Sequence, residues 1–356
     1  MNQKQPYSSI ISYNDPILVT GATGFIGTNL VKVLLDWGFR DLRCFARRST
    51  SISIGESYID SDSPVRVKML QGNLLSAEDC LAATKDVKVI FHLAAGRGEK
   101  STPDAFMNSV VTTRNLLKGA FEHQCLQRFV NVSSFAVYTN KGKPRWRLLD
   151  ESCPVENRPE RRADAYVFAK VKQDEIVIEY CKKLGIPYVI VRPGYVYGPG
   201  KDAITGRVGI DTFGFFLHLG GSNSIPFTYV ENCADAIALA GIRPGVDGEA
   251  FNIVDDDLPS SRQFLRLYKQ KVKRFRSVYV PHAASYALCY LWARYSNWSD
   301  GQLPAVFNPD RWHVNWKKTF YSNQKIKTQL GWKPRVPMAD GLNRYFECCQ
   351  DRQKRA

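Results

Sequence analysis

The chain has 356 residues, which is long enough to bury a large core in one α/β unit or in a core with an added lobe. Its apolar content of 44% and charged content of 23% are ordinary for a globular protein. Nine scattered cysteines without a Cys-x-x-Cys pair, and no histidines at ligand spacing, argue for a reducing cytosol and against a disulfide framework or a bound metal. The net charge of +15 comes without a nucleic-acid-binding motif, so solvated faces and attraction of a phosphate-bearing ligand are preferred to nucleic acid binding.

Strand-like and helix-like segments alternate along the chain after a polar start. Residues 1–15 lack an apolar segment and predict a loose tail rather than a secretion signal. Strands are expected at 17–20, 42–46, 65–71, 87–93, 128–133 and 188–192, and helices at 25–37, 103–123 and 164–183. This alternation predicts an α/β fold, a doubly wound parallel sheet of the Rossmann type. We expect an NAD(P)-binding domain over 16–195 and a smaller substrate-binding lobe over 196–356, with some later segments returning to the first sheet.

The turn between the first strand and the first helix contains three glycines, Gly21, Gly24 and Gly27. Gly21 permits a tight turn, Gly24 lets backbone N–H groups approach a pyrophosphate, and Gly27 lets the helix pack closely on the strand. The phosphates would lie at the positive N-terminal end of that helix. A strand–helix turn without a ligand is the alternative, because one glycine triplet alone is weak evidence.

A second pattern combines Tyr166 and Lys170, which lie one turn apart on the same helix face. A nearby ammonium group favours the phenolate, so we expect the pKa of Tyr166 to fall toward working pH, as a general acid/base for alcohol–ketone interconversion requires. Ser134 ends a predicted strand at the carboxyl edge of the sheet and could hold a substrate oxygen. The alternatives are an ordinary surface helix and a serine that caps the strand end.

Together these motifs resemble the extended short-chain dehydrogenase/reductase superfamily, also called the NAD-dependent epimerase/dehydratase family, over about residues 16–341. The resemblance implies that Ser134, Tyr166 and Lys170 are catalytic and that Asn108 supports the active site. It also includes a fourth-strand motif at 89–95 and a segment at 192–198 that lies against the nicotinamide in the family. The resulting cofactor-binding residues are Gly21, Thr23, Gly24, Phe25, Ile26, Gly27, Arg47, Arg48, Asn73, Leu74, Leu93, Ala94, Ala95, Lys170, Pro193 and Gly194.

The end of the second strand bears on the choice of cofactor. NAD enzymes of this type carry an acidic residue there, but this chain has Ala46 followed by Arg47 and Arg48. Guanidinium groups suit the 2′-phosphate of NADP, so NADP is the preferred cofactor and NAD the alternative. Both arginines could instead be surface charges. Asn73 stands where the family usually has Asp, and its carbonyl could still accept from the adenine amino group.

The substrate is expected to be bulky, that is, a sugar, sterol-like or lipid-linked molecule. Phe135 follows Ser134 where sugar dehydratases commonly have an acidic residue, and the segment 225–236 looks closer to the 3β-hydroxysteroid dehydrogenase-like branch. The apolar segment 278–293 follows a basic run at 266–276 and is too short and too interrupted to span a membrane. It could pack as a lid helix, the preferred interpretation, or rest weakly on an anionic membrane surface.

Three functions remain open from the sequence. The preferred one is an NADP-dependent oxidoreductase that transfers hydride at a secondary alcohol or ketone of a bulky small-molecule substrate, in the cytoplasm or peripherally at a membrane. A nucleotide-sugar epimerase with tightly bound NAD is the second. A non-catalytic dinucleotide-binding or sensor protein is the third, and the Ser134, Tyr166 and Lys170 set argues against it. A homodimer is also possible.

Overall fold

The computed structural model describes residues 8–47, 66–96, 98, 101–141, 147–201, 204–212, 214–299, 302 and 307–355. Its centre is a seven-stranded sheet in the order β12-β7-β5-β4-β1-β2-β3, and every neighbouring pair is parallel. The strands are β1 (Ile17–Thr20), β2 (Asp41–Ala46), β3 (Arg66–Gln71), β4 (Val89–His92), β5 (Arg128–Val132), β7 (Tyr188–Pro193) and β12 (Ala250–Ile253). The strand order reverses between β1 and β4, which is the point where doubly wound sheets bind ligands.

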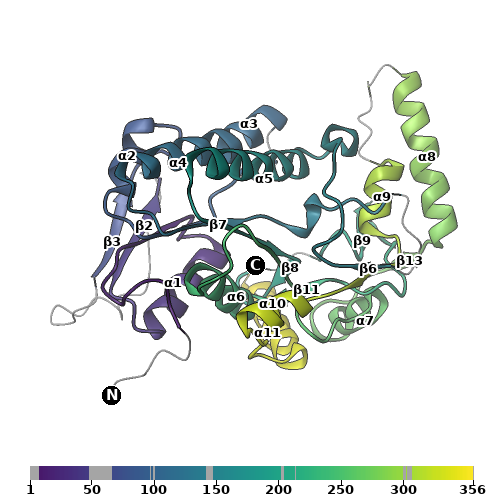
Figure 1. Ribbon diagram of the computed structural model, residues 1–356. Helices are drawn as coiled ribbons and strands as arrows, with labels where there is room; N and C mark the ends of the chain where they lie inside the picture. The colour runs from purple at the N-terminus through teal and green to yellow at the C-terminus, as the bar shows by residue number, and fades with distance from the viewer. Residues whose placement is uncertain are drawn as a thin grey trace.

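Helices cover both faces of this sheet (Figure 1). One face carries α1 (Phe25–Asp36) and α6 (Val230–Ile242), which pack on each other. The other face carries α2 (Ala77–Thr84), α4 (Thr112–His123) and α5 (Ala165–Leu184). The predicted doubly wound Rossmann fold is therefore confirmed.

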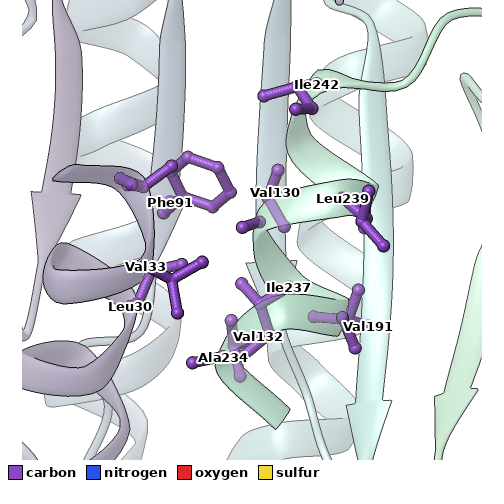
Figure 2. Close-up of a cluster of buried hydrophobic side chains, with 14 of the residues drawn as sticks. Leu30, Val33, Phe91, Val130, Val132, Val191, Ala234, Ile237, Leu239 and Ile242 are labelled. Atoms are coloured by element: carbon purple, nitrogen blue, oxygen red, sulfur yellow. The ribbon is translucent and has the colours of Figure 1, made fainter. Parts of the chain in front are cut away.

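The core between α1, α6 and the sheet is entirely apolar (Figure 2). Leu30 and Val33 of α1 face Ile237 of α6, and Phe91 of β4 and Val130 of β5 line the sheet side. Every residue of α6 except Glu231 is buried, as expected for a helix that is apolar nearly all round. This packing fixes α1, and with it the glycine turn, against the carboxyl end of β1.

The remaining elements form a second lobe beyond the carboxyl ends of the strands. In its three-stranded sheet the central β10 (Phe215–His218) pairs with β9 (Gly209–Thr212) and with β13 (Ser277–Tyr279). Two smaller sheets pair β8 (Tyr195–Tyr197) with β11 (Phe227–Tyr229) and β6 (Leu148–Leu149) with β14 (Phe320–Tyr321). Its helices are α7 (Ser261–Lys271), α8 (His282–Trp298), α9 (Pro309–Asn315) and α11 (Met338–Arg355), whereas α10 (Gln324–Leu330) buries Ile326 and Leu330 in the Rossmann core. α6 and β12 lie beyond residue 195 in sequence but belong to the Rossmann sheet and its cover.

The described part of the predicted N-terminal tail packs against the Rossmann core. Ile11 is 5% exposed. The backbone N–H of Ile10 donates to the Ile242 carbonyl at 2.8 Å, and the Tyr13 carbonyl accepts from the N–H of Arg40 at 2.8 Å. Residues 8–15 therefore cover the ends of α6 and α1.

Candidate active site

A cavity of about 820 Å³ opens where the Rossmann sheet meets the second lobe. Twelve of the predicted site residues line it. They are Gly21, Gly24, Phe25, Ile26, Gly27, Leu93, Ala95, Ser134, Tyr166, Lys170, Pro193 and Gly194. The ends of strands β1, β4, β5 and β7 and the starts of helices α1 and α5 thus meet at one cavity. This is expected at the topological switch point of a doubly wound sheet.

The glycine turn has the shape that a dinucleotide requires. Gly21 has φ of +69°, a conformation that favours glycine. A Cβ on Gly27 would lie 2.1 Å from the Gly21 carbonyl oxygen, so only glycine lets α1 start this close to the turn. α1 has Gly24 as its N-cap without a side-chain capping bond, and no acidic residue in its first turn. Its N-terminal N–H groups and positive dipole end therefore suit a pyrophosphate at the cavity wall.

Ser134, Tyr166 and Lys170 come together at the cavity from two elements. Ser134 follows β5 and caps the short 3₁₀ turn Phe135–Val137, where its Oγ accepts from the Ala136 N–H at 3.1 Å. Tyr166 and Lys170 lie in the first turns of α5, which begins after the N-cap Asp164. The Ser134 hydroxyl lies close enough to the Tyr166 phenol to lower the pKa of that phenol.

The Lys170 ammonium is buried and held by two acceptors. Its Nζ donates to the Val132 carbonyl at 2.8 Å and to Gln173 Oε1 at 2.9 Å. Both contacts anchor the side chain between the end of β5 and the next turn of α5. An ammonium group has three protons, so one remains to reach into the cavity that Lys170 lines.

A chain of buried hydrogen bonds continues from Gln173 to β1. Gln173 Nε2 donates to the Thr113 hydroxyl at 2.9 Å, and the same hydroxyl meets His92 Nε2 at 2.8 Å. Because Thr113 donates its own proton to the Ser109 carbonyl, it must accept from both neighbours. His92 is therefore protonated at Nε2, and its Nδ1 accepts from Thr20 at 2.8 Å. Every side chain in this hydrogen-bond network, from Gln173 to Thr20, therefore has a partner.

Burial dominates the pKa values at the site. Burial and the charge of Lys170 lower the pKa of His92 to about 3, so the imidazole is neutral. Burial lowers the pKa of Lys170 to about 8, although Asp174 opposes it. Burial also raises the pKa of Tyr166 above its ordinary value, opposed by the hydrogen bond from Ser134. The expectation that the pKa of Tyr166 falls toward working pH is therefore wrong, because burial is the largest influence on this phenol and raises its pKa.

The other predicted residues lie outside the cavity lining. Asn108 is on a π-helical turn, Met107–Val111, that interrupts the expected helix 103–123, and its amide donates to Asp104. Asn73 forms a local turn, with Oδ1 accepting from the Leu75 N–H at 3.0 Å. Arg47 is exposed beyond β2, and Arg48 lies outside the described residues. Thr23, Leu74 and Ala94 complete this group.

Sequence reasoning missed the basic side chains on the lobe side of the cavity. The lining includes Arg162, Lys201, Arg207 and Arg311 besides Lys170, against the single carboxylate of Asp164. Arg311 pairs with Asp164 at 3.4 Å, and Arg207 donates to the Val314 carbonyl at 2.8 Å. No short motif marks these residues, since they lie far apart in the chain. The excess of basic residues was the only available signal.

Comparison with known proteins identifies the class of this site. Residues 17–253 match the model of the NAD dependent epimerase/dehydratase family. The chain therefore belongs to this family and is an NAD(P)-dependent oxidoreductase. The predicted family membership is confirmed.

The relatives include both dehydrogenases and epimerases. The chain is 23% identical to the decarboxylating sterol-4-alpha-carboxylate 3-dehydrogenase of Mus musculus, over 92% of this chain and 88% of that protein. It is 30% identical to an uncharacterized UDP-glucose epimerase of Bacillus subtilis, over 67% of this chain and 76% of that protein. The fold is similar to that of UDP-glucuronic acid 4-epimerase from Bacillus cereus in complex with UDP-glucuronic acid and NAD, with a TM-score of 0.70, 21% identity and coverage of 94% and 99% of the two chains.

Neither a metal-binding cluster nor a membrane-spanning helix is present among the described residues. No group of three or more His, Cys, Asp or Glu side chains among them is arranged to hold a metal ion. Within the same part of the chain, no helix combines the length and the apolar character needed to cross a membrane.

Proposed function

We propose that this protein is an NADP-dependent dehydrogenase or reductase that acts at a secondary alcohol or ketone of a bulky, anion-bearing substrate. The observation that carries the proposal is the convergence of Ser134, Tyr166 and Lys170 with the glycine turn on one cavity. Binding of a dinucleotide alone would require the turn but not a phenol and a serine hydroxyl on the same cavity as a buried ammonium group.

In this mechanism each of the three residues has a separate task. When bound, the nicotinamide supplies or accepts the hydride. Tyr166 gives a proton to the substrate oxygen in reduction and takes it in oxidation, and Ser134 orients that oxygen. Lys170 holds the nicotinamide ribose with its third proton, while its other two bind the Val132 carbonyl and Gln173. The neutral His92 takes no part in proton transfer and only supports the hydrogen bonds behind Lys170.

The lining of the cavity supports the substrate class. The cavity of about 820 Å³ holds the dinucleotide as well as the substrate, so the charge of its lining, and not its volume, bears on the substrate class. Five cationic side chains line the cavity against the single carboxylate of Asp164, and this excess of positive charge favours an anionic ligand. Lys201 and Arg207 are two of these side chains and belong to the second lobe. Arg207 has the planar donor set that binds a carboxylate or phosphate bidentately. A carboxylated sterol-like substrate has these properties, in keeping with the mouse relative.

The choice of NADP depends on the end of β2. The strand ends at Ala46 without a carboxylate, and the exposed Arg47 follows directly. A guanidinium group at this position favours the 2′-phosphate, whereas an acidic residue would favour the free ribose hydroxyl of NAD.

A nucleotide-sugar epimerase with retained NAD is the second candidate. The same cationic side chains would suit the pyrophosphate of a sugar nucleotide, and the Bacillus cereus neighbour contains UDP-glucuronic acid and NAD. An epimerase oxidises and re-reduces its substrate and has no need to exchange the cofactor, whereas a dehydrogenase must release it after each turnover.

This difference allows a direct test. The freshly purified protein is denatured and any released nucleotide identified, and the affinities of the empty protein for NADPH and NADH are then compared by fluorescence titration. We expect little retained nucleotide and tighter binding of NADPH. Stoichiometric NAD in the released fraction would overturn the proposal in favour of the epimerase. Equal affinity for the two nucleotides would contradict the role of Arg47.

A further inference from the structure

Helix α8 has its polarity reversed relative to an ordinary surface helix. Its inward positions are small or polar, and Ser285, Cys289 and Ser296 are buried. Its outward positions include large apolar residues, with Leu288 and Leu291 each 60% exposed, beside small residues and the exposed Arg294 and Asn297. The exposed set along and beside this helix is Val278, Tyr279, Tyr286, Leu288, Tyr290, Leu291, Tyr295 and Trp298. A contiguous apolar surface of this kind marks an interaction site.

The inward face of α8 is firmly held by α9. Trp312 of α9 donates from its indole N–H to the Ser285 hydroxyl at 2.8 Å, and its ring meets that of Tyr286 edge-on at 5.0 Å. Trp292 makes a similar edge contact with Phe307 at 5.9 Å. These contacts fix which side of α8 faces outward, so the apolar exposure belongs to the folded state.

The position of α8 does not fit a lid over the cavity. Among the described residues none from 282–298 lines the cavity, whereas Arg311, Val314 and Asn315 of α9 do. α8 stands at the edge of the molecule, with α9 between it and the Rossmann sheet (Figure 1). Its outward face therefore has no partner in the part of the chain that the structure describes.

The charges around α8 indicate what this partner is. From residue 258 to 299 the sequence has eight Lys and Arg residues and no Asp or Glu. Lys271, Lys273, Arg274 and Arg276, which precede α8, are exposed, and none of the eight forms an ion pair with another described residue. A second copy of this chain would bring two such basic stretches together, which like-charge repulsion opposes.

We propose that α8 docks on an anionic membrane surface. In the docked state Leu288 and Leu291 enter the boundary between headgroups and acyl chains, and Tyr290, Tyr295 and Trp298 lie at the headgroup level, where amphipathic aromatic rings are favoured. The basic segment 271–276 binds the lipid phosphates. The inference concerns attachment to a surface and is independent of the proposed reaction.

Vesicle flotation with the full chain tests this proposal without any substrate. Vesicles of phosphatidylcholine are compared with vesicles of phosphatidylcholine and phosphatidylserine. We expect binding to the mixed vesicles, weakened by raised salt because the basic contribution is screened. The double variant Leu288→Glu/Leu291→Glu should lose roughly tenfold in binding for each leucine. Leu81→Glu on α2, a leucine that is 40% exposed, is the matched control and should bind like the unchanged protein.

A second variant protects the test against misfolding of α8. Arg274→Glu/Arg276→Glu lies outside the helix and should abolish the preference for phosphatidylserine while leaving the melting curve unchanged. The proposal fails if the unchanged protein stays with the bottom fraction in both lipids. It also fails if the purified protein self-associates and the leucine variant merely dissociates it, since the partner of α8 would then be a second copy.

Discussion

Helices α5 and α8 both depart from the usual pattern of polar outside and apolar inside, and they do so in opposite directions. α5 buries Lys170, Gln173 and Asp174 on its inner face. α8 exposes Leu288 and Leu291 on its outer face. For α5 the structure contains the partners that explain the departure, whereas for α8 it contains none among the described residues.

The two helices differ in whether the unusual side chains are compensated by contacts within the described structure. Burial of an ionisable group costs free energy unless it is paired, and α5 meets that condition at each position. Asp174 accepts from Asn131 at 2.9 Å and pairs with Arg192 at 3.2 Å. Exposed leucines on α8 have no such compensation among the described residues, and their proposed partner is a membrane surface. Substitutions on the two helices can test whether the buried polar groups of α5 act as their contacts indicate.

The largest effect is expected at Tyr166. Tyr166→Phe removes the proton donor but leaves the ring, the glycine turn and the Lys170 contacts in place. General acid/base catalysis contributes about 10²–10⁴-fold, so turnover should fall by that factor while nucleotide affinity stays nearly unchanged. Steady-state kinetics and nucleotide titration of the same preparation measure both. Retained turnover would remove Tyr166 from the proposed mechanism.

The ion pair of Asp174 and Arg192 should dominate stability on α5. Asp174→Asn keeps the shape but leaves a buried guanidinium without its counter-ion, which costs about 3–5 kcal/mol in the free energy of unfolding. On the same helix, the exposed pair Lys172–Glu175 at 2.7 Å is the matched control. Glu175→Gln should cost less than about 1 kcal/mol. Leu291→Asn on α8 should change the free energy of unfolding by only about 0.5 kcal/mol.

Denaturant unfolding of the three variants gives these values directly. Equal losses for Asp174→Asn and Glu175→Gln would mean that the buried pair is not what stabilises α5. A large loss for Leu291→Asn would mean that the outer face of α8 already contributes to folding, and the comparison between the two helices would break down.

Most of the fold was predictable because it depends on local patterns. The strands β1, β2 and β5 and the helix α1 lie within a residue or so of the expected positions, since apolar runs and glycine turns set them. The interruption of the helix 103–123 at Met107–Val111 was not predicted, because a π-helical turn leaves no mark in the apolar periodicity. The packing of Ile11 was also missed, since it depends on a surface of α6 that is distant in sequence.

The residues of the candidate site also fall into two groups, those marked by local sequence motifs and those that depend on the tertiary fold. The glycine turn and the Tyr166–Lys170 spacing are short-range features and could be recognised in the sequence. The cationic residues Arg207 and Arg311 depend on how the second lobe folds over the sheet, which no spacing encodes. The predicted direction of the Tyr166 pKa shift was wrong because burial dominates it, and burial depends on how the whole chain packs around the phenol. The contact of Lys170 with Gln173 was also missed, since no motif in the sequence marks Gln173.

The smallest of the expected effects is at Gln173, whose contacts make it a positioning residue for Lys170. Gln173→Leu keeps the size of the side chain but removes the acceptor at 2.9 Å from the ammonium. Loss of this acceptor disfavours the charged form, so the pKa of Lys170 should fall below its value of about 8. If protonated Lys170 is required, the alkaline limb of kcat/KM moves to lower pH, by less than about one unit for one hydrogen bond.

Gln173→Glu provides the opposite test at the same position. A carboxylate beside the ammonium favours the charged form, so the alkaline limb should move to higher pH. If Gln173 only supported the fold, both variants would lower kcat, and the alkaline limb of kcat/KM would not move in opposite directions. Limbs at the same pH in both variants would mean that the hydrogen bond from Lys170 to Gln173 does not control the protonation of the lysine. The buried polar face of α5 would then be structural at this position, and only Tyr166 and Lys170 would link it to catalysis.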